Sequence, residues 1–162
     1  MSEHGQPFVG LAGALVVDGA WIGPTVMHAD ATGAQHIHST YERASLHMDG
    51  HETFKAAVSR LSEVTLEALA AAELLPAVID LFVYHQANAR IPIAVSERLG
   101  LPDDRVVNAI GELGNTSAAS IPLALAAAER DGSLTPGARV LLGAFGAGFT
   151  WGATTLTWGG DA

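Results

Sequence analysis

The sequence of 162 residues contains no cysteine and a single lysine, Lys55. Without cysteine the chain has no disulfide scaffold, no thiolate metal site and no cysteine nucleophile. Its 8 lysine and arginine residues stand against 17 aspartates and glutamates, which gives a net charge of -9. A chain with this charge balance lacks the basic surface that binds phosphate backbones, so we expect no nucleic-acid partner.

Long apolar runs and targeting signals are also missing. The longest apolar run, residues 121–128, is far shorter than the roughly 20 residues that a membrane span needs. The first residues show no basic segment followed by an apolar stretch. We therefore expect a cytoplasmic protein with no membrane association. The hydrophobic fraction of 49% and charged fraction of 15% predict one folded domain, residues 1–162.

Apolar runs separated by glycine and proline predict alternating strands and helices. An Asp-Gly pair at 18–19 predicts a hairpin, and apolar residues three and four apart predict an amphipathic helix over 52–73. Such alternation is typical of an α/β domain with a mixed, mainly parallel sheet of five to six strands and helices on both faces. The expected order is β-β-α-β-α-β-α-β-β, with strands at 11–17, 21–27, 78–84, 105–110, 138–145 and 151–158, helices at 52–73, 87–99 and from 115 or 116 to 130, and a long loop at 28–49.

Residues 85–88, 114–117 and 145–148 follow three of the expected strands, where ligands of α/β sheets gather. The imidazole of His85 and the amide of Asn115 are both N–H donors, and two fixed donors can stabilise an oxyanion. Taken singly, each feature also has a structural interpretation. His85 could bond a backbone carbonyl, Asn115 could cap a helix, and the glycine-rich segment could be only a turn.

Four side chains of the long loop raise a second possibility, a zinc site, because imidazole and carboxylate groups suit that metal. Their spacing matches no recognised ligand pattern, so we expect no bound metal. They are His28, Asp30, His36 and His38.

Three motifs resemble the C-terminal half of beta-ketoacyl-ACP synthase III, a family of the thiolase superfamily. They read YHQANAR at 84–90, GNTSAAS at 114–120 and AFGAGFTWG at 144–152. Weaker similarity continues upstream through 48–55 and 28–30. The resemblance implies one thiolase-like half-fold and a decarboxylative Claisen condensation of malonyl and acyl thioesters. The thioester is carried by CoA or by the phosphopantetheine of an acyl carrier protein, and no further cofactor is implied.

The resemblance also implies roles for individual residues. His85 and Asn115 resemble the catalytic pair that binds the malonyl thioester oxygen and stabilises the enolate. The residues that resemble the substrate and carrier-binding positions are Phe54, Gln86, Ala87, Asn88, Ala89, Arg90, Phe145, Gly146, Ala147 and Gly148.

The sequence departs from the family pattern in four ways. Ala147 replaces a common glycine, His51 stands where asparagine is frequent, and residues 8–13 lack an aspartate. The cysteine-bearing N-terminal half has no counterpart. We therefore expect a heteromeric enzyme with the nucleophilic cysteine on a partner chain. The alternatives are a non-catalytic thioester-binding or regulatory half-domain and a subunit of a related acyltransferase. The cations available for an acidic carrier protein are few: Lys55, Arg60, Arg90 and Arg98.

Overall fold

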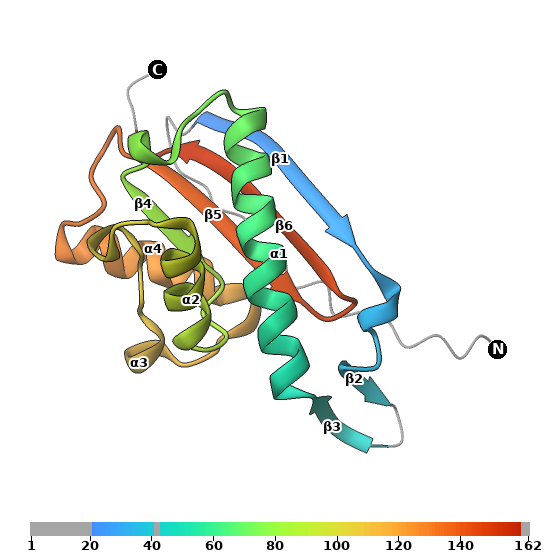
Figure 1. The fold of residues 1–162 in the computed structure, drawn as a ribbon. Coiled ribbons are helices and arrows are strands. Elements are labelled where there is room, and N and C mark those ends of the chain that lie inside the picture. The colour runs from blue at the N-terminus through green and yellow to red at the C-terminus, as the bar shows by residue number, and fades with distance from the viewer. Residues whose placement is uncertain (1–20, 41–42, 160–162) are drawn as a thin grey trace.

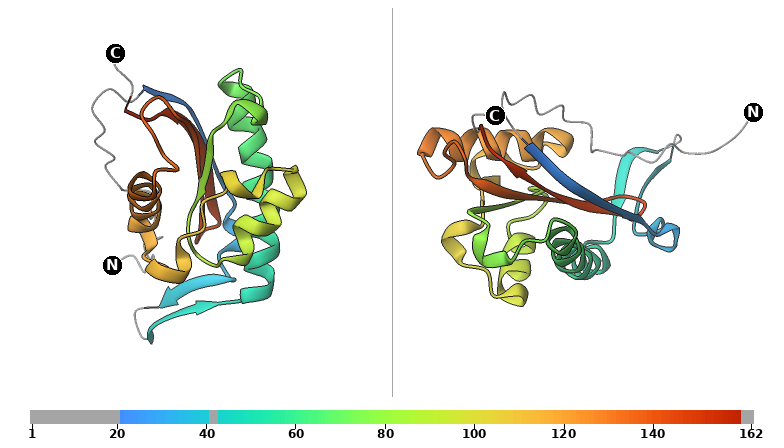
Figure 2. Two further views of the ribbon diagram at one scale, coloured as in Figure 1. Left: turned by 90° about the vertical axis from the view of Figure 1, so that its left-hand side faces the viewer. Right: turned by 90° about the horizontal axis from the view of Figure 1, so that it is seen from above.

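The computed structural model describes residues 21–40 and 43–159, which form a layered α/β fold (Figure 1). Two helices cover one face of the central sheet and a third covers the other face (Figure 2). The elements are β1 (Trp21–Ala29), β2 (Ile37–Thr40), β3 (Arg43–Met48), α1 (Gly50–Ala71), β4 (Leu81–Tyr84), α2 (Arg90–Leu99), α3 (Ile110–Leu113), α4 (Ser120–Asp131), β5 (Arg139–Gly146) and β6 (Thr150–Thr157), with short 3-10 turns η1 (Ala31–Gly33), η2 (Pro76–Val78), η3 (Asp103–Arg105) and η4 (Ser117–Ala119).

The central sheet has the order β1-β6-β5-β4 among the described strands. β4 pairs with β5 in parallel, whereas β5–β6 and β6–β1 are antiparallel. The expected mixed sheet is confirmed, but the expectation that it is mainly parallel is wrong for this part of the chain. Only residues 147–149 separate β5 from β6, and a connection this short reverses the chain and forces antiparallel pairing.

The expected strand at 105–110 does not form. Its first residue ends η3, and its only ladder contact is an isolated parallel bridge between Val106 and Phe82. The side-chain amide of Gln86 instead bonds the Val107 carbonyl and the Ala109 N–H. A side chain thus takes the backbone groups that a neighbouring strand would otherwise pair.

Residues 28–49 are not the single long loop that their polar composition predicts. They extend β1 to Ala29 and then form a separate two-stranded sheet, β2–β3, in which His38 lies opposite His47. The expected strand at 11–17 and the hairpin at 18–19 lie outside the described residues.

The helices begin and end close to the expected positions. Asp49 caps α1 by accepting a 3.2 Å hydrogen bond from the N–H of Glu52. α2 ends at Gly100, whose φ of +64° is in the left-handed region that glycine adopts without strain. α4 starts at Ser120 rather than at 115 or 116, because Ser117 has a φ of +52° and only the short turn η4 precedes the helix.

Two apolar clusters lie on opposite sides of the sheet and fix β4 between them. Leu61 and Val64 of α1 pack with Phe82 on one side, while Leu125 of α4 packs with Val83 on the other. All four residues of β4 are buried. The carboxyl end of β4 is therefore a rigid point from which the next residue, His85, is held. Within the described residues, no helix is both long and apolar enough to cross a membrane.

Candidate active site

His85 lies directly after β4 and continues its pairing with β5, since its backbone N–H donates to the carbonyl of Gly143 at 2.8 Å. Its imidazole Nδ1 lies 2.6 Å from the hydroxyl oxygen of Ser120, the first residue of α4. The side chain is half-buried, and burial lowers the pKa of His85 below its ordinary value. The imidazole is therefore neutral near neutral pH. Its Nε2 has no hydrogen-bond partner among the described residues.

Asn115 lies in the turn that leads into α4. Gly114 has φ +67° and ψ −173°, a conformation that a residue with a side chain rarely adopts. The Oδ1 of Asn115 accepts a 3.0 Å bond from the N–H of Ser117. The side chain is exposed, and within the described residues its Nδ2 group has no partner. This local bond orients the amide so that its N–H groups remain available to a ligand.

Ser120 connects these two parts of the site. It lies five positions after Asn115 in the sequence, and its hydroxyl also accepts a 3.3 Å bond from the N–H of Gln86. The structure thus ties the turn that carries Asn115 to the strand end that carries His85. Sequence reasoning assigned no role to Ser120. The available signal was its position as the last residue of the second motif.

Gln86 is buried, with 1% of its surface exposed. Its Nε2 donates to the carbonyl of Tyr84 at 2.8 Å and to that of Val107 at 3.3 Å, and its Oε1 accepts from the N–H of Ala109 at 2.9 Å. All these partners are backbone groups. The side chain therefore fixes the path of the chain beside β4 and does not reach the surface.

The remaining residues of the first motif continue from the strand end into α2. Asn88 is exposed, and its Oδ1 accepts a 3.0 Å bond from the N–H of Arg90. The guanidinium of Arg90 lies over the ring of Phe54, 5.3 Å from its centroid, a cation–π arrangement. Ala87 and Ala89 are half-buried. The structure therefore brings together Phe54 and Arg90, two of the residues predicted to bind substrate or carrier.

The turn between β5 and β6 carries the third motif. The rings of Phe145 and Phe149 are buried with their centroids 4.9 Å apart. Ala147 packs against the core, and its carbonyl accepts a 2.9 Å bond from the Thr150 hydroxyl. No atom lies within 4 Å of the point where a side chain on Gly146 would begin. Phe149, which sequence reasoning did not single out, also stacks on His36 with centroids 5.8 Å apart.

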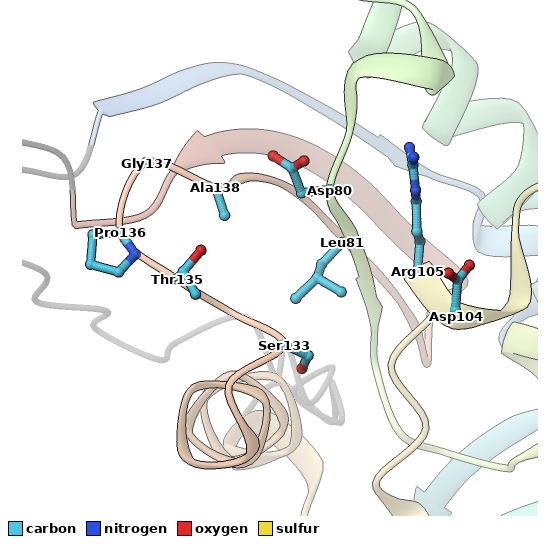
Figure 3. A pocket seen from close by; sticks show the side chains of 9 residues that line it. All are labelled: Asp80, Leu81, Asp104, Arg105, Ser133, Thr135, Pro136, Gly137 and Ala138. Atoms are coloured by element: carbon cyan, nitrogen blue, oxygen red, sulfur yellow. The ribbon is translucent and has the colours of Figure 1, made fainter.

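Two hollows open on the surface of the described residues. One, of about 540 Å³, is at the opposite end of β4, between Asp80, Arg105 and residues 133–138 (Figure 3). Two of its three charged side chains bond the backbone: Arg105 donates to the carbonyls of Ala77 and Ile79, and Asp80 accepts from the N–H of Arg139. The other hollow, of about 390 Å³, lies near Lys55 and Arg60 on α1. Neither hollow is lined by His85 or Asn115.

The four side chains considered for zinc do not converge. His28 Nε2 lies 2.6 Å from a carboxylate oxygen of Glu67, and His38 Nδ1 lies 3.1 Å from the carbonyl of Gln35. His36 lies 3.6 Å from Asp49, whereas Asp30 accepts bonds from Thr32. Across residues 21–40 and 43–159, no three histidine, aspartate or glutamate side chains form a group that could hold a metal ion.

Comparison with known proteins matches a part of the chain that contains all three motifs. The C-terminal domain of 3-oxoacyl-[acyl-carrier-protein] synthase III matches residues 69–158. The solved beta-ketoacyl-[acyl carrier protein] synthase III of Thermus thermophilus is 46% identical with a TM-score of 0.82, and the match covers 90% of this chain and 49% of that one. The synthase III of Pseudomonas aeruginosa is 37% identical with a TM-score of 0.80, over 85% of this chain and 44% of that one.

A third relative comes from polyketide biosynthesis. The priming beta-ketosynthase of the R1128 pathway is 36% identical with a TM-score of 0.79, and the match covers 85% of this chain and 45% of that one. This chain thus spans about half the length of the solved structures that it matches. The motifs, the thiolase-like fold and these matches agree, and the chain belongs to the 3-oxoacyl-[acyl-carrier-protein] synthase III family, of which it carries the C-terminal domain.

Proposed function

We propose that this chain supplies the two oxyanion donors of a decarboxylative Claisen condensation, His85 and Asn115. The observation that carries the proposal is the linkage of these residues through Ser120. The imidazole is bonded to the first residue of α4, and Asn115 lies in the turn just before that helix. Among the described residues, Nε2 of His85 and the Nδ2 group of Asn115 have no hydrogen-bond partner.

The proposed reaction begins with a malonyl thioester. Loss of carbon dioxide leaves the electron pair of the broken C–C bond on the thioester enolate, whose negative charge resides largely on oxygen. Two donors aimed at this oxygen stabilise the charge as it develops. The enolate carbon then attacks the carbonyl of an acyl group held on a cysteine. A new C–C bond forms, the C–S bond to cysteine breaks, and the products are a beta-ketoacyl thioester and the free thiolate.

The cysteine in this scheme comes from a second, cysteine-bearing half of the enzyme, because none of the 162 residues is cysteine. The outer face of α4 favours such a partner. No charged residue occurs over 120–128, and Leu123 on this helix is 38% exposed. By contrast, α1 presents Lys55, Arg60 and Glu63 in ion pairs on its outer side. An apolar, uncharged helix face is typical of a surface that another protein covers.

The proposed substrates are thioesters of CoA or of the phosphopantetheine arm of an acyl carrier protein. The relatives' names specify acyl carrier protein. In the segment 86–90, Asn88 and Arg90 are exposed whereas Gln86 is buried. Arg90, whose guanidinium lies over the Phe54 ring, is therefore available to a negatively charged arm or carrier. Asn88 is available beside it, while Gln86 supports the segment from within.

The test combines this chain with a cysteine-bearing N-terminal domain of the family and follows malonyl-CoA and malonyl-carrier decarboxylation and condensation with acetyl-CoA. His85→Ala and Asn115→Ala are each expected to lower the decarboxylation rate by roughly 100- to 1,000-fold. His47→Ala and Asn108→Ala change exposed residues of the same types and should leave the rate unchanged.

Two results would contradict the proposal. One is a stable complex that does not decarboxylate malonyl thioesters. The other is a complex in which acyl transfer depends on His85 but not on Asn115, because transfer to an alcohol or amine needs a general base and not a second donor. That result would assign the chain to a related acyltransferase.

A further inference from the structure

The hydroxyl of Ser120 is enclosed at the base of the candidate site. The residue is 1% exposed, so bulk water does not reach it. Two groups lie within hydrogen-bond distance of its oxygen, the backbone N–H of Gln86 at 3.3 Å and Nδ1 of His85 at 2.6 Å. Among the described residues no carbonyl, carboxylate or other acceptor is bonded to this hydroxyl.

The direction of the His85–Ser120 bond follows from counting protons. A serine hydroxyl has one proton to donate and two lone pairs with which to accept. The N–H of Gln86 has to donate, so it occupies one lone pair. If Nδ1 of His85 also donated, the proton of Ser120 would have no acceptor in a site closed to water. A buried donor without an acceptor is unfavourable, whereas donation from Ser120 to an unprotonated Nδ1 satisfies every group.

We propose that Ser120 is a positioning residue that holds His85 in the tautomer with a bare Nδ1 and a proton on Nε2. Burial, which lowers the pKa of the imidazole, keeps the ring neutral and so keeps the tautomers distinct. Nε2 is then a hydrogen-bond donor. It has no lone pair with which to act as a general base.

This tautomer specifies the role of His85 in the proposed reaction, and the consequence rests on the proposed function. An Nε2–H group can donate to the enolate oxygen together with the amide of Asn115. The opposite tautomer would present a lone pair to that oxygen and would repel the developing charge. The hydroxyl of Ser120 therefore selects oxyanion stabilisation over proton abstraction, although it touches neither substrate nor reacting atom.

The first test reads the tautomer directly, without substrate or partner. The full chain is labelled with ¹⁵N-histidine, and two-bond ¹H–¹⁵N correlation spectra are recorded at a pH where His85 is neutral. The signals of His85 are assigned from their loss in His85→Asn. We expect a protonated Nε2 and an unprotonated Nδ1 in the parent protein, a mixture of tautomers in Ser120→Ala, and the parent pattern in Ser120→Thr, which keeps the hydroxyl. A protonated Nδ1 in the parent, or an unchanged tautomer in Ser120→Ala, would overturn the inference.

A matched control separates the tautomer from general loss of packing. Ser62 is also buried, and its hydroxyl donates to the carbonyl of Val58 at 2.7 Å. Ser62→Ala should leave the His85 signals in place even where it lowers stability. In the assembled enzyme, Ser120→Ala should lower kcat for decarboxylation by about 10-fold with little change in KM, as expected for loss of one neutral hydrogen bond that orients a donor. The expected tautomer without decarboxylation by the complex would contradict the proposed function and leave this inference standing, so the two failures are distinguishable.

Discussion

The side-chain oxygen of Gln86 accepts a 2.9 Å hydrogen bond from the backbone N–H of Ala109, 23 positions further along the chain. The nitrogen of the same amide donates to the carbonyls of Tyr84 and Val107. One side chain thereby joins the end of β4 to the segment that leads to Asn115. The relative placement of the two proposed donors depends on this link as well as on Ser120.

Replacing Gln86 by alanine is expected to destabilise the fold by about 2–4 kcal/mol, because it leaves buried backbone groups unpaired and opens a cavity. The measurement is the free energy of unfolding from urea titration followed by circular dichroism. Gln35→Ala provides the matched control, since Gln35 is exposed and its amide lies 3.4 Å from His36. We expect a change within about 0.5 kcal/mol for that variant. Equal effects of the two substitutions would show that the Gln86 bonds contribute little.

Glycine at position 33 is required by the ring of Phe149. A Cβ on Gly33 would overlap that ring, whereas a Cβ on Gly50 would have no atom within 4 Å. Gly33→Ala should lower the free energy of unfolding by about 1–3 kcal/mol through overpacking. Gly50→Ala, at the first residue of α1, should be neutral or stabilising by less than about 1 kcal/mol. If Gly33→Ala matched Gly50→Ala, the contact between the η1 turn and Phe149 would be looser than described.

The stability of the fold should depend on the ionisation of His85. Burial lowers its pKa in the folded state below the ordinary value of 6.5. The unfolded chain therefore binds this proton more readily than the folded chain. The stability that the neutral imidazole contributes is fully present above the pKa of His85 in the unfolded chain, and it is lost as pH falls through the lower pKa of the folded state. Urea titrations across this range should show a smaller loss of stability on acidification for His85→Gln than for the parent. His51→Gln, which removes a histidine side chain that is 75% exposed, should retain the parent's dependence.

The outer face of α4 can be tested separately from the chemistry. Leu123→Glu places a charge on the proposed partner surface, and Leu66→Glu places one on α1, where Leu66 is 48% exposed. Desolvating an unpaired carboxylate is costly, so Leu123→Glu should weaken binding of the cysteine-bearing half by roughly 10- to 100-fold. Leu66→Glu should leave it unchanged in analytical ultracentrifugation or calorimetric titration. Equal affinities of the two variants would place the partner elsewhere.

Local patterns were sufficient to predict most of the central fold. The three- and four-residue spacing of apolar side chains predicted α1 within two residues at either end. The apolar run before His85 predicted β4, although the strand begins at Leu81 and not at Val78, which lies in η2. The glycines at 100 and 132 end α2 and α4 in the left-handed conformation that their position suggested. In these elements propensity, periodicity and capping agree, so the local signal and the tertiary structure coincide.

The missed features depend on contacts between distant residues. β2 shows no alternation of polar and apolar residues, so its pairing partner could not be predicted from its own pattern. β3 does alternate polar and apolar residues over 43–48, and this was a signal for a strand within the expected loop. The apolar residues at 105–110 favour a strand, but only Val106 and Val107 reach Phe82 of β4, and the side chain of Gln86 bonds the Val107 carbonyl and the Ala109 N–H. Ser120 is separated from His85 by 35 positions. The sequence placed Ser120 inside a helix expected to begin at 115 or 116, and only the folded structure shows that it begins α4 and which group its hydroxyl meets. The catalytic roles of His85 and Asn115 stay predictions from the resemblance.

The position of β6 inside the sheet has a consequence for how the chain is made. β1 pairs with β6, and the hydroxyls of Thr25 and Thr154 bond across that pair although they are 129 positions apart. During synthesis β1 leaves the ribosome long before any described strand that can pair with it, so its backbone groups must wait in water or in transient contacts. The sheet closes only when the residues up to Thr157 have emerged. Completion of the sheet is therefore a late event, because β6 has to enter between β1 and β5 after both have been made.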